Sequence, residues 1–119
     1  MPKAMDQHVQ ETFLYLSQAS QNTWTPNTDV YETPDVLVVK MELAGVEEND
    51  VTVTVEGRLL VVRGVRHDPC RQKRCSFQQV EIDYGPFERR VLLARPVAGD
   101  RIEVRLSHGL LTVQLPKAS

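Results

Sequence analysis

Strict alternation of apolar and polar side chains near the end of the chain limits its fold more than any other feature. Every second side chain is apolar over residues 102–106, and the same pattern resumes over 111–115 after a short turn. A period of two places these side chains on one face, so the two runs predict a hairpin with one buried wall. We expect a three-residue loop in which Gly109 supplies the positive φ beside His108. Pro116 lacks the amide that would continue the second strand.

The cleanest alternation lies over residues 51–56, and a second β-branched run returns over 59–66. The turn between them is too short for a crossover, so the two runs are expected to pair antiparallel. Further strands are predicted over 35–43 and 85–93, with a short one around Val30 and Tyr31. A chain of 119 residues can form one domain with a modest core. Short strands separated by turn signals predict an all-β sandwich rather than an α/β fold.

Residues 1–23 are predicted to be an N-terminal arm that precedes the sandwich. A short helix is expected over 6–18, capped by Asp6 and followed by a polar linker. A helix of about 12 residues is marginal in water on its own, so its apolar face needs a partner. That partner is the same domain, a sister subunit or a bound protein. The apolar side chains of this face are Val9, Phe13, Leu14 and Leu16.

No catalytic constellation emerges from the sequence. Ser107 and His108 are adjacent, are expected to point apart and do not form a triad. A glycine-rich phosphate loop and a repeated ligand spacing are both absent from the sequence. We therefore expect a protein that is not an enzyme and carries no cofactor or metal.

We favour the interpretation that the two cysteines are inert thiols. Two alternative interpretations remain open. His67, Cys70 and Cys75 could hold zinc only with a fourth ligand and tighter spacing. A redox-sensitive pair is the stronger alternative, because Arg71, Lys73 and Arg74 are expected to lower the pKa of the thiols.

The partners of the chain are constrained by its charge. The basic cluster formed by Arg63, Arg66, Arg71, Lys73 and Arg74 has no interleaved aromatic residues, so nucleic-acid recognition by stacking is disfavoured. A net charge of -2 predicts neither a polyanion binder nor a membrane-surface protein. The chain shows no signal peptide and no apolar run that could span a bilayer, which predicts a cytoplasmic location.

Several motifs resemble the signature of the small heat-shock proteins of bacterial type, the alpha-crystallin domain family. The opening of the predicted domain, the turn after residue 43, the strand near 85 and the final hairpin all carry parts of that signature. The matching residues are Trp24, Pro26, Asp29, Glu32, Thr33, Leu43, Gly45, Gly85, Phe87, Arg89, Leu93, Val97, Gly109, Leu110, Leu111, Leu115, Pro116 and Lys117. Val104 and Ala94 stand where the family usually has Ala and Pro.

This resemblance implies an immunoglobulin-like β-sandwich, the alpha-crystallin domain, over residues 24–117. Family members usually continue into a tail with an Ile-x-Ile type motif, whereas residues 118–119 form only a truncated tail. The resemblance therefore implies homodimers or small oligomers rather than large shells.

The resemblance also implies a role for the long connection over residues 67–84. In the bacterial and plant branch this loop carries a strand that joins the sheet of the sister subunit, here residues 75–82. The implied dimer interface contains Phe77, Val80, Glu81 and Arg89, with Arg89 partly buried beside a carboxylate. Glu81 and Glu88 are both candidate acceptors.

The function that the resemblance implies is ATP-independent holding of non-native proteins, which prevents their aggregation. Apolar edge strands can accept extended segments through main-chain hydrogen bonds. The expected client groove lies between the strands over 51–55 and 102–106 and is lined by Val51, Val53, Val104 and Leu106. The alternative is a co-chaperone or adaptor sandwich that binds one folded partner.

Overall fold

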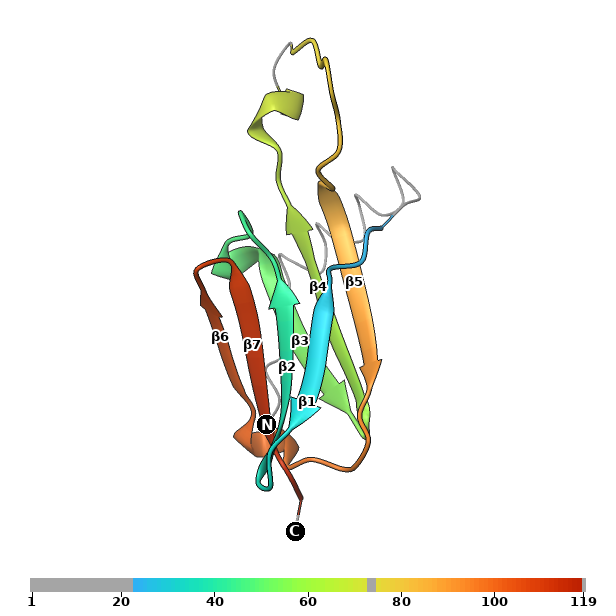
Figure 1. Ribbon diagram of the computed structural model, residues 1–119, viewed down its shortest axis with the longest axis vertical. Coiled ribbons are helices and arrows are strands. Elements are labelled where there is room, and N and C mark those ends of the chain that lie inside the picture. Colours follow the sequence, from blue (N-terminus) through green and yellow to red (C-terminus); the bar gives the residue numbers. More distant parts are fainter. Residues whose placement is uncertain (1–22, 73–74, 119) are drawn as a thin grey trace.

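Two antiparallel sheets pack face to face in the computed structural model of this chain, which describes residues 23–72 and 75–118 (Figure 1). The first sheet has the strand order β1-β2-β7-β6, and the second has the order β3-β4-β5. The β-sandwich expected from the alternating runs is thus confirmed. The strands are β1 (Thr28–Glu32), β2 (Val36–Glu42), β3 (Val51–Glu56), β4 (Leu59–Arg66), β5 (Gly85–Leu92), β6 (Glu103–Ser107) and β7 (Leu110–Pro116).

Short 3-10 turns are the only helical elements of the described chain. They are η1 (Glu48–Asp50), η2 (Pro69–Gln72) and η3 (Gly99–Arg101). Within residues 23–72 and 75–118, the structure contains no helix that could span a bilayer. The helix predicted over 6–18 lies outside the described residues.

Alternation sets the register of the second sheet. Val53 faces Val62 across the β3–β4 pair, and Glu56 faces Leu59 beside the turn. Gly57 adopts a φ of 63° in that turn, a conformation that glycine reaches without steric cost. The second sheet therefore places one apolar face toward the first sheet.

The core lies between the two sheets and belongs to this single chain. Phe87 is fully buried and packs its ring against that of Trp24, with centroids 5.2 Å apart. Fifteen buried apolar side chains form the core cluster, and they are Leu37, Val39, Met41, Leu43, Val46, Val51, Val53, Leu60, Val62, Phe87, Val91, Leu93, Leu111, Val113 and Leu115.

The β6–β7 hairpin is tighter than the sequence suggested. Ser107 pairs directly with Leu110, so the loop has two residues, His108 and Gly109, instead of the three that we expected. Both have positive φ, 55° for His108 and 77° for Gly109. This combination is the type I′ turn, whose twist matches that of the flanking strands.

The connection between β4 and β5 extends well beyond the ends of the sheets (Figure 1). The turn η2 lies near its tip, and residues 75–82 return toward β5 without forming a strand. A strand requires a hydrogen-bonded neighbour, and residues 75–82 have none in the described part of this chain. The strand expected here, which would form with a second subunit, stays a prediction.

Candidate functional site

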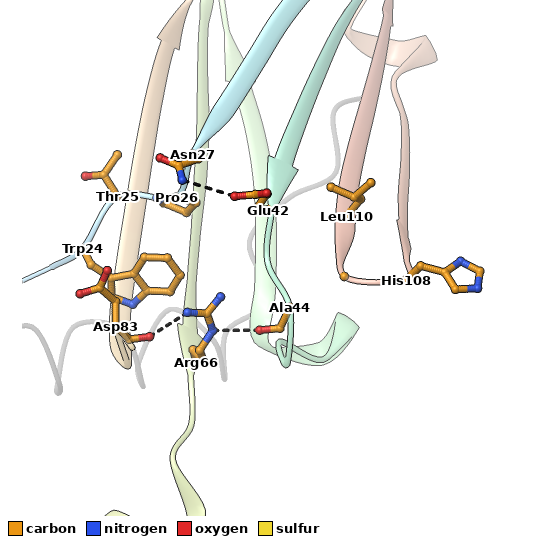
Figure 2. Close-up of a pocket in the computed structure, with 11 residues that line it drawn as sticks. Trp24, Thr25, Pro26, Asn27, Glu42, Ala44, Arg66, Asp83, His108 and Leu110 are labelled. Carbon is orange, nitrogen blue, oxygen red and sulfur yellow. Dashed lines mark hydrogen bonds between the residues drawn. The ribbon is translucent and has the colours of Figure 1, made fainter. Parts of the chain in front are cut away.

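Arg66 holds the base of the long loop against the sandwich. Its Nε donates to the carbonyl oxygen of Ala44 at 2.9 Å, and its Nη1 donates to that of Asp83 at 2.8 Å (Figure 2). The guanidinium also lies 4.3 Å from the centroid of the Trp24 ring, a cation–π arrangement. Arg66 therefore ties the start and the end of the loop to the domain, so that the loop leaves the sheets in a defined direction.

A pocket of about 630 Å³ opens beside Arg66 at this end of the sandwich (Figure 2). Trp24 and Asp83 line one side of it, and His108 and Leu110 lie on the opposite side. Asn27 donates to Glu42 across the remaining wall at 3.3 Å. The wall is largely polar and internally hydrogen-bonded, which suits a structural junction better than an apolar binding site.

Residues 75–82 present apolar side chains to solvent. Phe77 is 50% exposed, Val80 is 58% exposed and Ile82 is 60% exposed. A shallow cavity of about 220 Å³ lies among them and is bordered by Cys70 and Tyr84. Exposed apolar side chains grouped on one projecting segment are typical of an interaction surface.

The edge strand β1 presents a second exposed apolar surface. Val30 is 50% exposed and Tyr31 is 45% exposed. Since β1 pairs only with β2, one row of its backbone donors and acceptors has no strand partner in the described chain. The sequence patterns did not single out these residues as a site, although their β-branched and aromatic character on a short first strand was a usable signal.

Arg89 lies on the inner face of β5, opposite Val62 and between the buried Phe87 and Val91. It is half-buried, as expected. Within residues 23–72 and 75–118, however, no carboxylate lies at ion-pair distance from it.

Both acceptors that we considered for Arg89 are otherwise engaged in this chain. Glu88 pairs with Arg63 at 3.2 Å and with Arg90 at 3.0 Å. Glu81 accepts a hydrogen bond from Gln79 at 2.7 Å. A carboxylate partner for Arg89 from a second subunit stays a prediction.

The four residues expected to line a client groove divide into two pairs. Val51 and Val53 are 3% and 1% exposed and belong to the core. Val104 and Leu106 are half-buried on the edge strand β6 and pack against that core. Only Val104 and Leu106 are within reach of another chain in this conformation. Val104 also borders a cavity of about 400 Å³, together with Glu103, Arg105, Thr112 and Gln114.

Cys70 and Cys75 are free and exposed. The Cys75 thiol donates to the carbonyl oxygen of Cys70 at 2.9 Å. The pKa of the Cys75 thiol is raised by desolvation first, and then by a hydrogen bond and electrostatic repulsion from Cys70 and by repulsion from Asp68. Our expectation of a lowered pKa is therefore wrong for Cys75, because these neighbours disfavour the thiolate.

No group of three metal-ligating side chains forms among the described residues. His67 lies 3.4 Å from Asp50 instead, across the base of the loop.

Ser107 and His108 contact each other, contrary to our expectation that they point apart. The Oγ of Ser107 lies 2.9 Å from Nδ1 of His108. In the described chain no carboxylate ion-pairs with His108, so the pair lacks the third member of a catalytic triad.

The described members of the basic cluster make separate contacts within the fold. Arg63 pairs with Glu88, and Arg66 supports the loop. The side chains of Arg71, Lys73 and Arg74 lie outside the described part of the chain. The two described members of the cluster are thus engaged within the fold.

Comparisons with known proteins agree with this architecture. The model of the Hsp20/alpha crystallin family matches residues 29–119. Spore protein SP21 of Stigmatella aurantiaca is 35% identical over 79% of this chain and 56% of its own length. Small heat shock protein C2 of Rickettsia felis is 28% identical over 89% of this chain and 68% of its own length. The chain thus spans between about half and two thirds of the length of these relatives.

Solved structures give the same result. Heat shock protein 16.0 from Schizosaccharomyces pombe superposes with a TM-score of 0.74 at 34% identity, over 81% of this chain and 89% of that one. A small heat-shock protein from Xylella fastidiosa, described as having a distinct high order structure, superposes with a TM-score of 0.73 at 30% identity, over 82% of this chain and 90% of that one. From the family match and these relatives together, the chain belongs to the Hsp20/alpha crystallin family, the small heat-shock proteins.

Proposed function

We propose that this chain is an ATP-independent holdase, a chaperone that binds non-native proteins and keeps them from aggregating. Members of its family are ATP-independent chaperones rather than enzymes. The observation that carries the proposal is the apolar edge of β6, where Val104 and Leu106 are only half-buried beside backbone groups that have no strand partner in the described chain.

Binding at such an edge tolerates many sequences. An extended client segment adds to the sheet through main-chain hydrogen bonds, which any residue except proline can supply. The partly exposed apolar side chains add contact area. We infer that Val104 and Leu106 form this client surface, with the buried Val51 and Val53 supporting it from below.

We further propose a homodimer formed by strand exchange, with small oligomers built from it. Residues 75–82 pair with the β1 edge of a sister subunit, so that Phe77 and Val80 leave solvent and Glu81 supplies a charge at the interface. We propose that Arg89, which has no carboxylate partner in the described chain, pairs with a carboxylate from that subunit. The proposed location is the cytoplasm, with residues 24–117 as the domain and residues 1–23 as its arm.

The proposed holdase activity is tested with a client protein that aggregates on heating. Without ATP, we expect an equimolar amount of this protein to suppress the light scattering of the aggregating client. Val104→Ser/Leu106→Ser is expected to weaken this suppression, and Leu92→Ser, which removes an apolar side chain that is 71% exposed elsewhere, leaves it unchanged. Client aggregation at an unaltered rate would indicate an adaptor for a folded partner instead.

Deletion of the loop tests the exchanged dimer. A variant without residues 67–82, joined by a short glycine linker, is expected to have the mass of a monomer by light scattering. An unchanged dimer would show that the subunits associate through another surface.

A further inference from the structure

Two cysteines meet near the tip of the long loop between β4 and β5, and the proposed function uses neither of them. Cys70 belongs to the turn η2, and Cys75 begins the segment that returns toward β5. The sulfur of Cys75 lies 2.9 Å from the carbonyl oxygen of Cys70. Both residues are exposed, so a reagent in solution can reach them.

The distance between the two residues is of the size that a disulfide spans. A carbonyl oxygen lies about 2.4 Å from the Cα of its own residue, so the Cys75 sulfur is at most about 5.3 Å from the Cα of Cys70. Disulfides join residues whose Cα atoms are about 4.4–6.8 Å apart. Besides desolvation, which is the larger cause, electrostatic repulsion from the Cys70 thiol raises the pKa of Cys75, and this repulsion requires the thiols to be close.

Folding holds the two limbs of the loop together around this pair. The carboxylate of Asp68 accepts a hydrogen bond from the amide of Cys70 at 3.0 Å, which fixes the start of η2. Cys70 also borders the cavity of about 220 Å³ whose other side is lined by Phe77 and Val80 of the returning limb. The approach of the thiols is therefore a property of the folded loop, and not only of their short spacing in the sequence.

We propose that Cys70 and Cys75 form a reversible redox site, which closes to an intramolecular disulfide by exchange with a low-molecular-weight disulfide such as oxidised glutathione. One cysteine thiolate attacks a sulfur of that disulfide, forms a mixed disulfide and releases one glutathione thiolate. The second cysteine thiolate attacks the protein sulfur of the mixed disulfide, closes the ring and releases the other glutathione thiolate. The two cysteines lose two electrons and two protons, and the two glutathione molecules gain them.

This site is expected to react slowly at neutral pH. The pKa of Cys75 is raised and only a thiolate attacks, so the rate of closure should increase as the pH rises. In the proposed cytoplasmic location, the bond is expected only when the pool of low-molecular-weight thiols becomes oxidised. Closure fastens the start of residues 75–82 to η2, and only its effect on subunit exchange rests on the dimer proposed above.

Glutathione redox buffers test the proposal with the unaltered protein. At equilibrium with mixtures of reduced and oxidised glutathione, the folded chain should form the disulfide about tenfold more readily than the chain unfolded in urea. By linkage, the oxidised chain should then unfold at a higher urea concentration than the reduced chain. A mass lower by two hydrogen atoms identifies the closed ring.

Trypsin locates the bond, because Arg71, Lys73 and Arg74 lie between the two cysteines. After free thiols are blocked, cleavage at these residues should give two peptides that stay joined until a reductant is added. Cys70→Ser is the control, and it should carry only a mixed disulfide at Cys75, with the added mass of one glutathione.

Three results would overturn the proposal. An equal or lower preference for the disulfide in the folded chain means that the loop does not bring the thiols together. Joined peptides that come from two chains, detected by mixing isotopically marked and unmarked protein, mean that the cysteines link subunits instead. Stable mixed disulfides at both cysteines mean that the ring does not close. The holdase assay above is read with the reduced protein, so each of these failures is separate from a failure of the proposed function.

Discussion

At the scale of single residues, Gly64 permits a close approach between neighbouring parts of the sandwich. A Cβ built on Gly64 would lie 2.5 Å from Cζ of Phe87 and would also clash with the carbonyl oxygen of Asp50. The Phe87 ring thus occupies the space that the missing side chain leaves on the neighbouring strand. We expect Gly64→Ala to lower the free energy of unfolding by about 1–3 kcal/mol, measured by urea denaturation. The double variant with Phe87→Leu should recover part of this loss, and an unchanged urea midpoint for Gly64→Ala would contradict the argument.

Cys75 offers a residue-scale test of electrostatics. Its pKa is raised in the folded chain, so the neutral thiol is favoured below the unfolded pKa, and this stabilisation is lost as the pH rises through the folded pKa. We therefore expect the midpoint of its alkylation against pH to lie above that of the urea-unfolded chain. Cys70→Ser should move the midpoint down, since it removes the electrostatic repulsion from the Cys70 thiol; mass spectrometry of the modified peptide provides the readout. A midpoint at or below the unfolded one would refute the assignment.

At the scale of elements, the turn of the β6–β7 hairpin contains backbone strain that a single substitution should relieve. His108 has a positive φ, a backbone conformation that is costly for most residues other than glycine and asparagine. His108→Asn creates the preferred Asn-Gly pair and should raise the free energy of unfolding by about 0.5–1 kcal/mol. Gly109→Ala should lower it by about 1–2 kcal/mol, because the left-handed conformation penalises a Cβ and Ala44 lies close by. Thermal unfolding of the two variants checks both signs, and a destabilised His108→Asn would show that the contact with Ser107 matters more than the backbone.

The strands themselves were largely predictable from the sequence, since alternation reports which face each side chain occupies. The predicted run over 59–66 matches β4 residue for residue. The two-residue loop at His108 was missed because histidine is an uncommon residue in a type I′ turn. The role of Arg66 depends on Ala44 and Asp83, which become neighbours only when the sheets assemble, so no local pattern could reveal it. For the same reason, burial of Thr52 on an outer face could not be read from a polar residue in an alternating strand.

At the scale of the whole molecule, the core and the proposed interface are separate. Every residue of the core cluster belongs to the sandwich of one chain, whereas Phe77, Val80 and Ile82 are at least half exposed on the projecting loop. We therefore expect Phe77→Ser/Val80→Ser/Ile82→Ser to weaken the dimer without unfolding the subunit. Light scattering on dilution should detect monomers at concentrations where the unaltered protein is dimeric, and the urea midpoint of the variant should not depend on protein concentration.

Two matched variants separate association from folding in the same experiment. Leu92→Ser removes an apolar side chain that is 71% exposed and distant from the loop, and it should change neither dimer affinity nor stability. Leu60→Ala removes a fully buried side chain and should lower the free energy of unfolding by about 2–5 kcal/mol while the folded fraction still dimerises. If the loop variant unfolded as readily as Leu60→Ala, the loop would be part of the folding unit. The subunit would then be stable only as a dimer, because an interface whose loss unfolds the chain is inseparable from its core.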